Sequence, residues 1–293
     1  MRISAKGLLP NLTGDIRMDR LRFGTAGIPI STPRPGTIEG LKRVKELGLE
    51  CMELEFVRQV HLNEESAKLV RAEAARLDIE LTVHAPYFIN LNSLEDKKRE
   101  ESIGRILKSA RIGTLAGAKS VTFHAAFYMG QDKEKVYGAV KESIQKIVKI
   151  LRDEGNTIMI RPELTGKETQ WGDLQELIKI SQDTEGVLPC IDFAHYFARY
   201  NGRYNSAEDF ARLLSEIEEG LGREALDNMH IHMSGIEHGQ KGERMHLVLE
   251  ESNFNYKAVL EAWHDFSIKG VVVSESPSIE QDALLMKRLY ERF

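Results

Sequence analysis

Short apolar runs rich in Val, Ile, Leu and Phe alternate along the chain with longer stretches whose apolar residues recur about every 3.6 positions. The short runs are typical of buried strands, and the longer stretches of amphipathic helices. The predicted strands are Leu21–Ile28, Glu50–Phe56, Glu80–His84, Ser120–His124, Thr157–Glu163, Leu188–Asp192, Met229–Met233 and Gly270–Glu275. The predicted helices are Thr37–Leu47, Glu64–Leu77, Leu94–Ala116, Lys133–Glu154, Gly172–Thr184, Ser206–Leu221, Tyr256–Phe266 and Ile279–Tyr290. Eight strand-helix repeats predict a (β/α)₈ TIM barrel, with an open doubly wound sheet as the structural alternative.

Capping and turn residues fall where this division needs them. Ser206 stands at an expected helix N-cap and Gly117 at an expected helix end. Because no Pro/Ser-rich hinge divides the sequence, we expect one domain over residues 1–293, with residues 1–20 as an N-terminal extension. The long connection from Ser234 to Asn255 is expected to be an active-site loop.

Composition narrows the class of protein. The 293 residues are 42% hydrophobic, which is enough for a large core, and no segment resembles a secretory signal or a membrane span. Cys51 and Cys190 lie in apolar runs without CxxC spacing, so neither a disulfide framework nor a thiolate zinc site is indicated. We therefore expect a cytoplasmic protein. The net charge of −5 disfavours a broad basic surface for nucleic acid, although bound dications would add positive charge that this count omits.

Side chains that can bind metal ions end six of the predicted strands: His84, His124, Glu163, Asp192, His230 and Glu275. A barrel of this type assembles its active site at the C-terminal ends of its strands, so these side chains should converge there. Buried together, the carboxylates and imidazoles would be costly unless cations neutralised them. Imidazole with carboxylate suits Zn²⁺ first, with Mn²⁺ or Fe²⁺ also compatible, and six ligands favour two ions sharing a carboxylate.

Two runs make the pattern recognisable. They are His-Ala-Pro-Tyr-Phe-Ile-Asn-Leu at 84–91 and Ile-Asp-Phe-Ala-His at 191–195, and Phe-His at 123–124, Met-His at 229–230 and Ser-Glu at 274–275 accompany them. In order and approximate spacing these segments resemble the endonuclease IV family (AP endonuclease family 2), which belongs to the xylose isomerase-like TIM barrels. The resemblance covers nearly the whole predicted barrel.

The resemblance implies a ligand role for each of these strand-end residues. One zinc would be held by His84, His124 and Glu163, and Glu163 would bridge to a second zinc. That second zinc would be held by Asp192, His230 and Glu275 as well.

The resemblance also implies a third zinc, for which His195 matches one ligand. The family's other two ligands are an Asp and a His separated by one residue, whereas this chain reads Glu243-Arg244-Met245-His246. Met245 stands where the His is expected, and a thioether is a poor zinc ligand. Either His246 takes over through a local change of register, with Glu243 in the Asp position, or the third site is weak, absent or filled by a different ion. His232 and His238 lie nearby as substitutes.

The resemblance implies a zinc-dependent endonuclease that cleaves double-stranded DNA 5′ to abasic sites in base excision repair. Glu163 or Glu275 would orient or deprotonate the attacking water. Tyr87 and Phe88 resemble the wedge that the family pushes into DNA, and Arg58 could contact phosphate. We expect a monomer. Arg161, which shares the inward face of its strand with Glu163, is expected to neutralise excess carboxylate.

Two other functions stay open at this point. A sugar isomerase or epimerase of the same superfamily would bind one Mn²⁺ or Mg²⁺ through a quartet resembling Glu163, Asp192, His230 and Glu275, and would have less need of two further imidazole ligands. A barrel that binds damaged DNA without catalysis is the other, and the loss at Met245 gives it some support.

Overall fold

The computed structural model describes residues 18–293, so most of the predicted N-terminal extension, residues 1–20, lies outside the described residues. Eight parallel strands form the central sheet, in the order β6-β4-β3-β2-β1-β12-β9-β8. Their bounds are β1 (Leu21–Ala26), β2 (Cys51–Glu55), β3 (Glu80–His84), β4 (Ser120–Phe123), β6 (Met159–Pro162), β8 (Cys190–Asp192), β9 (Met229–Met233) and β12 (Gly270–Ser274). Parallel bridges from Ile160 to Val187 and from Glu163 to Cys190 join the two outer strands. The predicted TIM barrel is therefore confirmed.

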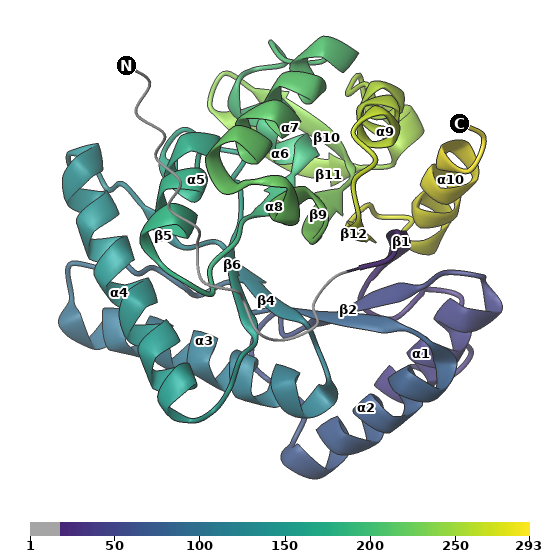
Figure 1. Cartoon of the computed structure of the whole chain (residues 1–293), viewed down its shortest axis with the longest axis horizontal. Coiled ribbons are helices and arrows are strands. Elements are labelled where there is room, and N and C mark those ends of the chain that lie inside the picture. Colours follow the sequence, from purple (N-terminus) through teal and green to yellow (C-terminus); the bar gives the residue numbers. More distant parts are fainter. Residues whose placement is uncertain (1–17) are drawn as a thin grey trace, which may run out of the picture.

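Helices surround the strands on the outside of the barrel (Figure 1). Their bounds are α1 (Thr37–Glu46), α2 (Glu64–Leu77), α3 (Asp96–Ala116), α4 (Lys133–Asp153), α5 (Leu174–Asp183), α6 (Phe193–Arg199), α7 (Ala207–Leu221), α8 (Arg223–Leu226), α9 (Tyr256–Asp265) and α10 (Glu280–Tyr290). The N-cap predicted at Ser206 is present, since its side chain accepts a hydrogen bond from the Asp209 amide at 3.2 Å. Gly117 ends α3 in the left-handed conformation, at φ 84°.

Strand alternation separates the core from the site. On β3, Leu81 and Val83 are buried apolar residues, and Val83 comes so close to α3 that a Cβ on Gly113 would lie only 2.9 Å from it. Thr82 and His84 point the other way, into the barrel. Outward residues thus pack against helices, and inward residues are free to carry chemistry.

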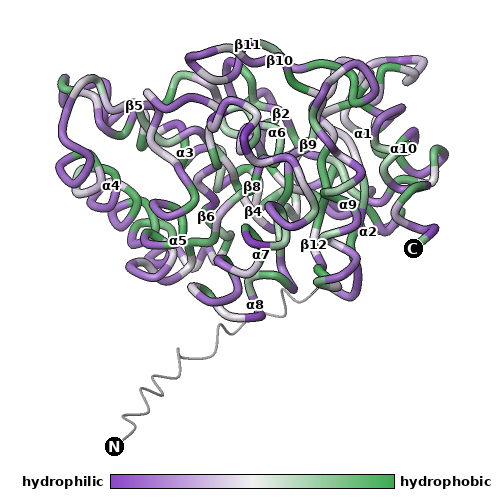
Figure 2. Tube along the Cα trace, turned by 90° about the horizontal axis from the view of Figure 1, so that it is seen from above, coloured by the Kyte–Doolittle hydropathy of each residue, from purple (hydrophilic) through white to green (hydrophobic). Residues whose placement is uncertain are grey.

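Several short elements were not predicted. The connection from Ser234 to Asn255 contains an antiparallel pair, β10 (Gly235–Gly239) and β11 (Gly242–Leu247), followed by a single 3₁₀ turn, η1 (Leu249–Glu251). A second small pair joins β5 (Ala126–Phe127) to β7 (Gln170–Trp171). In Figure 2, β10 and β11 lie at one end of the barrel and α8 at the opposite end. β5 and β7 have only two residues each, and β10 and β11 consist mostly of Gly, polar and charged residues, so neither pair shows the apolar run by which the barrel strands were predicted.

Among residues 18–293 the Arg161 guanidinium pairs with backbone carbonyls and with no carboxylate, contrary to the prediction. Its guanidinium is buried and donates to the backbone carbonyls of Pro189 at 2.8 Å and Asn228 at 2.6 Å. Burial also lowers its pKa to about 10. Arg161 therefore links β6 to the residues just before β8 and β9.

Cys51 and Cys190 are both buried and free, as predicted. Among residues 18–293 no helix combines the length and the apolar character needed to cross a membrane.

Candidate metal centre

Glu163 lies at the middle of a cluster of imidazoles in the barrel mouth. Glu163 follows β6 directly, and its side chain is 1% exposed. One carboxylate oxygen lies 3.3 Å from His84 Nε2 at the end of β3, and the other lies 3.1 Å from His124 Nε2, just after β4. Because the Nδ1 of His84 lies 2.7 Å from the carbonyl of Ala85, which can only accept, Nδ1 carries the proton and Nε2 is left facing Glu163. These three residues could hold one metal ion, and we call them the first ligand group.

A second ligand group shares Glu163 and adds Asp192, His232 and Glu275, with ligand atoms within 4.8 Å of one another. His232 Nδ1 lies 3.4 Å from Glu163 and 3.3 Å from Glu275. Asp192 ends β8 and caps α6, where one oxygen accepts from the His195 amide at 2.6 Å and leaves the other for the mouth.

The structure places His232 in this group, whereas the sequence pattern had indicated His230. His230 Nε2 lies 2.9 Å from Glu53, and its Nδ1 lies 3.1 Å from the Ser120 hydroxyl. The two histidines are two positions apart on β9, so both face the interior, with His230 one layer deeper. Strand alternation turns both histidines inward, and the depth of β9 in the barrel decides which of them reaches the mouth.

A third ligand group lies beside the second one. His195 Nε2 is 3.4 Å from His246 Nε2 and 3.5 Å from a carboxylate oxygen of Glu243. The Nδ1 of His195 lies 3.0 Å from the carbonyl of Leu164, which accepts its proton, so the opposite nitrogen faces His246. Asp192 completes this group of candidate ligands.

A β-bulge in β11 brings Glu243 and His246 to the same face. His238 pairs with Glu243, but the next residue of β10, Glu237, pairs with Met245, so Arg244 is an extra residue in β11. Regular alternation would turn Glu243 and Met245 to one side. With the extra residue, Met245 is instead 53% exposed and His246 points toward His195. The structure thus has a change of register where Met245 had suggested a lost ligand.

The buried oxygens of this cluster fit bound cations. Both oxygens of Glu163 and Oδ2 of Asp192 are inaccessible to solvent, and among residues 18–293 none has a hydrogen-bond partner of good geometry. Leaving a buried polar group unpaired costs about 1–3 kcal/mol, and more when the group is charged. A cation at each ligand group would satisfy them, and the mixture of imidazole and carboxylate suits zinc, manganese or iron.

The pKa values show how the metal-free cluster balances its charges. Burial alone would raise the pKa of Glu163, but His124 and His232 outweigh it and hold that pKa well below the ordinary value. Burial alone would lower the pKa of His84 and His195, but neighbouring carboxylates raise both to about 10. Protons on these imidazoles therefore take the place that cations would take, and metal binding must displace them.

Apolar side chains are exposed around the mouth and form what we call the apolar rim: Ile30, Val57, Tyr87, Phe88, Leu94, Phe127, Met129 and Met245. All of them follow the C-terminal ends of strands or lie on β11. Tyr87 and Phe88, predicted to act as a wedge, are 57% and 66% exposed, and Arg58 is exposed after β2.

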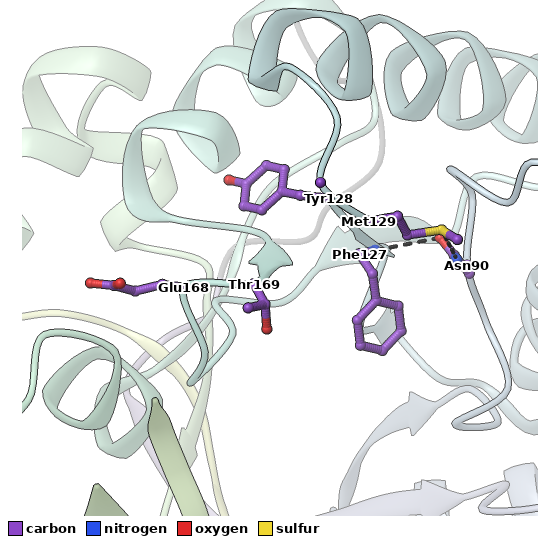
Figure 3. Close-up of a pocket in the computed structure, with 7 residues that line it drawn as sticks. Asn90, Phe127, Tyr128, Met129, Glu168 and Thr169 are labelled. Carbon is purple, nitrogen blue, oxygen red and sulfur yellow. Dashed lines mark hydrogen bonds between the residues drawn. The ribbon is translucent and has the colours of Figure 1, made fainter. Parts of the chain in front are cut away.

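A pocket of about 580 Å³ opens beside this rim (Figure 3). Its lining includes Asn90, Phe127, Met129 and Glu168, and the Asn90 amide donates to the Met129 sulfur at 3.5 Å. The lining contains one carboxylate and no imidazole, so the metal chemistry belongs to the barrel mouth instead.

A barrel of eight parallel strands with candidate metal ligands in its mouth agrees with what sequence comparison finds. The chain belongs to the xylose isomerase-like TIM barrel family, whose model matches residues 41–290. It is 44% identical to an uncharacterized protein of Methanocaldococcus jannaschii over 270 residues, covering 92% of this chain and 97% of that protein. It is 23% identical to the probable endonuclease 4 of Aquifex aeolicus, covering 71% and 76%. The predicted resemblance is confirmed at the level of family.

Solved structures of two kinds share the fold. The crystal structure of endonuclease IV from Thermus thermophilus superposes with a TM-score of 0.72 at 20% identity, covering 93% of this chain and all of that one. That of a D-tagatose 3-epimerase-like protein superposes with a TM-score of 0.69 at 18% identity, covering 92% and 96%. At such identities the likeness establishes the fold, and the chemistry must be argued from this chain's residues.

Proposed function

We propose that this protein is a metal-dependent phosphodiesterase that cleaves double-stranded DNA 5′ to abasic sites. The observation that carries the proposal is the set of three adjoining ligand groups, the first two of which share Glu163. A shared carboxylate between neighbouring groups is the arrangement expected where two cations bind the attacking and leaving oxygens of one phosphodiester.

The residues fit zinc at each group, with manganese or iron compatible. His84, His124 and Glu163 would hold the first ion, and Glu163 with Asp192, His232 and Glu275 the second. His195, His246 and Glu243 would hold the third, together with Asp192, which it shares with the second group. His232 takes the role for which His230 had been predicted. When bound, such cations activate water and neutralise charge on the phosphodiester.

The two central carboxylates, Glu163 and Glu275, would have different roles. The Glu163 side chain is 1% exposed and touches imidazoles, so it holds the two ligand groups together. The Glu275 side chain is 14% exposed and lies nearer the opening, so it can accept a proton from an attacking water or orient that water. We therefore assign general-base chemistry to Glu275 and the bridging role to Glu163.

The apolar rim supports DNA as the substrate. Tyr87 and Phe88 project from the loop after β3, directly beside His84, whose ring centroid is 5.4 Å from that of Tyr87. Exposed aromatic and aliphatic side chains can enter a base stack left incomplete by a missing base. Arg58 would contact phosphate nearby. A small sugar would make no use of an exposed rim of this extent.

A nicking assay on a labelled duplex with one abasic site tests the proposal. The zinc-loaded protein should leave a 3′-hydroxyl and a 5′-deoxyribose phosphate. Glu275→Gln should lower the rate by at least about 100-fold, as expected for loss of a general base, and because Glu275 is also a ligand of the second group the zinc content of the variant is measured alongside. Glu142→Gln is the control. It makes the same substitution at an exposed residue of α4 and should leave the rate unchanged.

The second ligand group, taken alone, favours a different function. Glu163, Asp192, His232 and Glu275 form a quartet of the kind a single-metal ketose epimerase would use, and an epimerase-like protein is among the similar structures. One metal per chain, turnover of a ketose and intact abasic DNA would establish that function instead. Tight binding of abasic duplex without cleavage, unaffected by Glu275→Gln, would indicate a non-catalytic DNA-binding barrel.

A further inference from the structure

Three histidines of the metal centre are oriented by backbone carbonyls. The Nδ1 atoms of His84, His195 and His246 lie 2.7, 3.0 and 3.2 Å from the carbonyls of Ala85, Leu164 and Glu275. A carbonyl only accepts, so each Nδ1 carries a proton and each Nε2 is the nitrogen whose lone pair becomes available once a cation displaces any proton on it. This arrangement fixes the tautomer without any side chain.

His232 is oriented in the opposite sense. Its Nδ1 faces Glu163 and Glu275, and its Nε2 points down the barrel to a carboxylate oxygen of Glu53, 2.9 Å away. A lone pair on Nε2 would repel the Glu53 carboxylate, so Nε2 carries a proton, and Nδ1, which faces the two carboxylates of the second ligand group, is the nitrogen that would bind a cation there.

Glu53 is built into the barrel interior. It lies on β2, is fully buried, and receives a hydrogen bond from Thr82 on the neighbouring strand at 2.7 Å. The oxygen that accepts from Thr82 also lies 2.9 Å from His230 Nε2, and His230 Nδ1 lies 3.1 Å from the Ser120 hydroxyl. The other oxygen is left for His232. Glu53 also lies close enough to Glu55 and Glu275 to form a candidate ligand group with them, but its two oxygens face His232 and His230 at 2.9 Å, so it is placed to act on those histidines.

We propose that Glu53 is a positioning residue that holds His232 in the Nε2-protonated form and turns its Nδ1 toward the second ligand group. A carboxylate behind a ligating imidazole fixes the ring and raises its basicity, which strengthens the metal bond. The inference rests on the metal centre of the proposed function, and is independent of whether DNA is the substrate. It also gives His230 a role, as a partner of Glu53.

The test replaces Glu53 with Gln and measures metal binding without any substrate. Gln keeps the volume of Glu, but it is uncharged and its amide nitrogen donates, so it cannot accept from Thr82 and also present an acceptor oxygen to both His230 and His232. Competition with a chromogenic chelator should show one zinc bound about 10- to 100-fold more weakly, as for other partners of ligating histidines. The remaining zinc ions should bind as in the unaltered protein.

Thr82→Val is the matched control. It removes a hydrogen bond from the same buried carboxylate but leaves both Glu53 oxygens facing histidines. The unfolding midpoint of the metal-free protein should fall for both variants, whereas zinc affinity should fall for Glu53→Gln alone. Equal zinc affinities in Glu53→Gln and the unaltered protein, or an equal loss in both variants, would overturn the inference.

A second measurement needs no substitution and so does not depend on a variant that folds. Nitrogen-15 NMR of the histidine rings in the zinc-loaded protein should show His232 protonated at Nε2, and His84 and His195 protonated at Nδ1. Protonation of His232 at Nδ1 would refute the positioning role while leaving the metal centre intact. A protein that binds no zinc at all would refute the metal centre as well.

Discussion

Replacing His246 with Ala tests the third ligand group and the bulge that forms it. The Nε2 atoms of His246 and His195 are 3.4 Å apart, so both imidazoles are directed at one position beside Glu243. Removing His246 leaves His195 as the only imidazole of this group, beside the carboxylates of Asp192 and Glu243, and so weakens the binding of an ion there. We expect the purified variant to contain one zinc fewer per chain, because the other two ligand groups do not use His246.

The same variant should lose part of the stabilisation that zinc provides. An ion present at 100 times its dissociation constant adds about 2.7 kcal/mol to the free energy of unfolding, provided it binds only the folded state. Denaturant unfolding with and without zinc at that ratio should therefore show a zinc-dependent gain about 2.7 kcal/mol smaller in His246→Ala. The metal-free stabilities are compared first, so that any direct effect of the substitution is removed.

Met245→Ala is the control, since Met245 is the neighbouring residue on β11 and its side chain is 53% exposed on the opposite face. This variant should keep the full zinc content, measured by elemental analysis after gel filtration. Loss of an ion from Met245→Ala, or a zinc content of His246→Ala equal to that of the unaltered protein, would contradict the ligand role of His246.

Three further predictions concern the cluster and its rim. Glu163→Gln should lower zinc content at the first two ligand groups together and reduce abasic-site cleavage by at least about 100-fold, measured by elemental analysis and nicking assay; cleavage at an undiminished rate would exclude the bridging role. The pKa values of His84 and His195 are raised to about 10 from an ordinary 6.5, so their contribution to metal-free stability is complete below pH 6.5 and is lost as pH rises toward 10. Denaturant midpoints of metal-free protein should thus fall over this range, and a rise would contradict the sign. Phe88→Ala should weaken binding of abasic duplex about 10-fold, the order expected for one stacking contact, while zinc content stays unchanged; equal binding in a gel-shift titration would remove Phe88 from the interface.

Much of the site could be predicted because strand ends fix where side chains go. His84 and Asp192 end their strands, and Glu163 and Glu275 follow theirs directly, so the barrel topology alone brings them to one mouth. Their apolar flanking runs made the strands visible in the sequence. The ligand roles themselves stay predictions.

Other parts depend on geometry that the sequence does not display. His230 and His232 share a face, and only the depth of β9 relative to its neighbours decides which one reaches the mouth. Glu53 and Glu55 on β2 were not singled out, although a strand reading Met-Glu-Leu-Glu, with carboxylates on its inward face, was a usable signal. Burial raises the pKa of Glu55 to about 8, and its place near Glu275 adds a further carboxylate to the mouth.

The bulge at Arg244 bears on how related chains are compared. A search for an acidic residue and a His separated by one position would score Glu243-Arg244-Met245-His246 as a ligand replaced by methionine. The pairing of β10 with β11 instead leaves one extra residue, Arg244, without a partner in the ladder. Glu243 and His246, on either side of the bulge, therefore point to the same face. An inserted residue in a hairpin can thus leave the positions of candidate ligands unchanged while it shifts them in a sequence alignment. A related chain that shows a different residue at an aligned ligand position can therefore still place a ligand there.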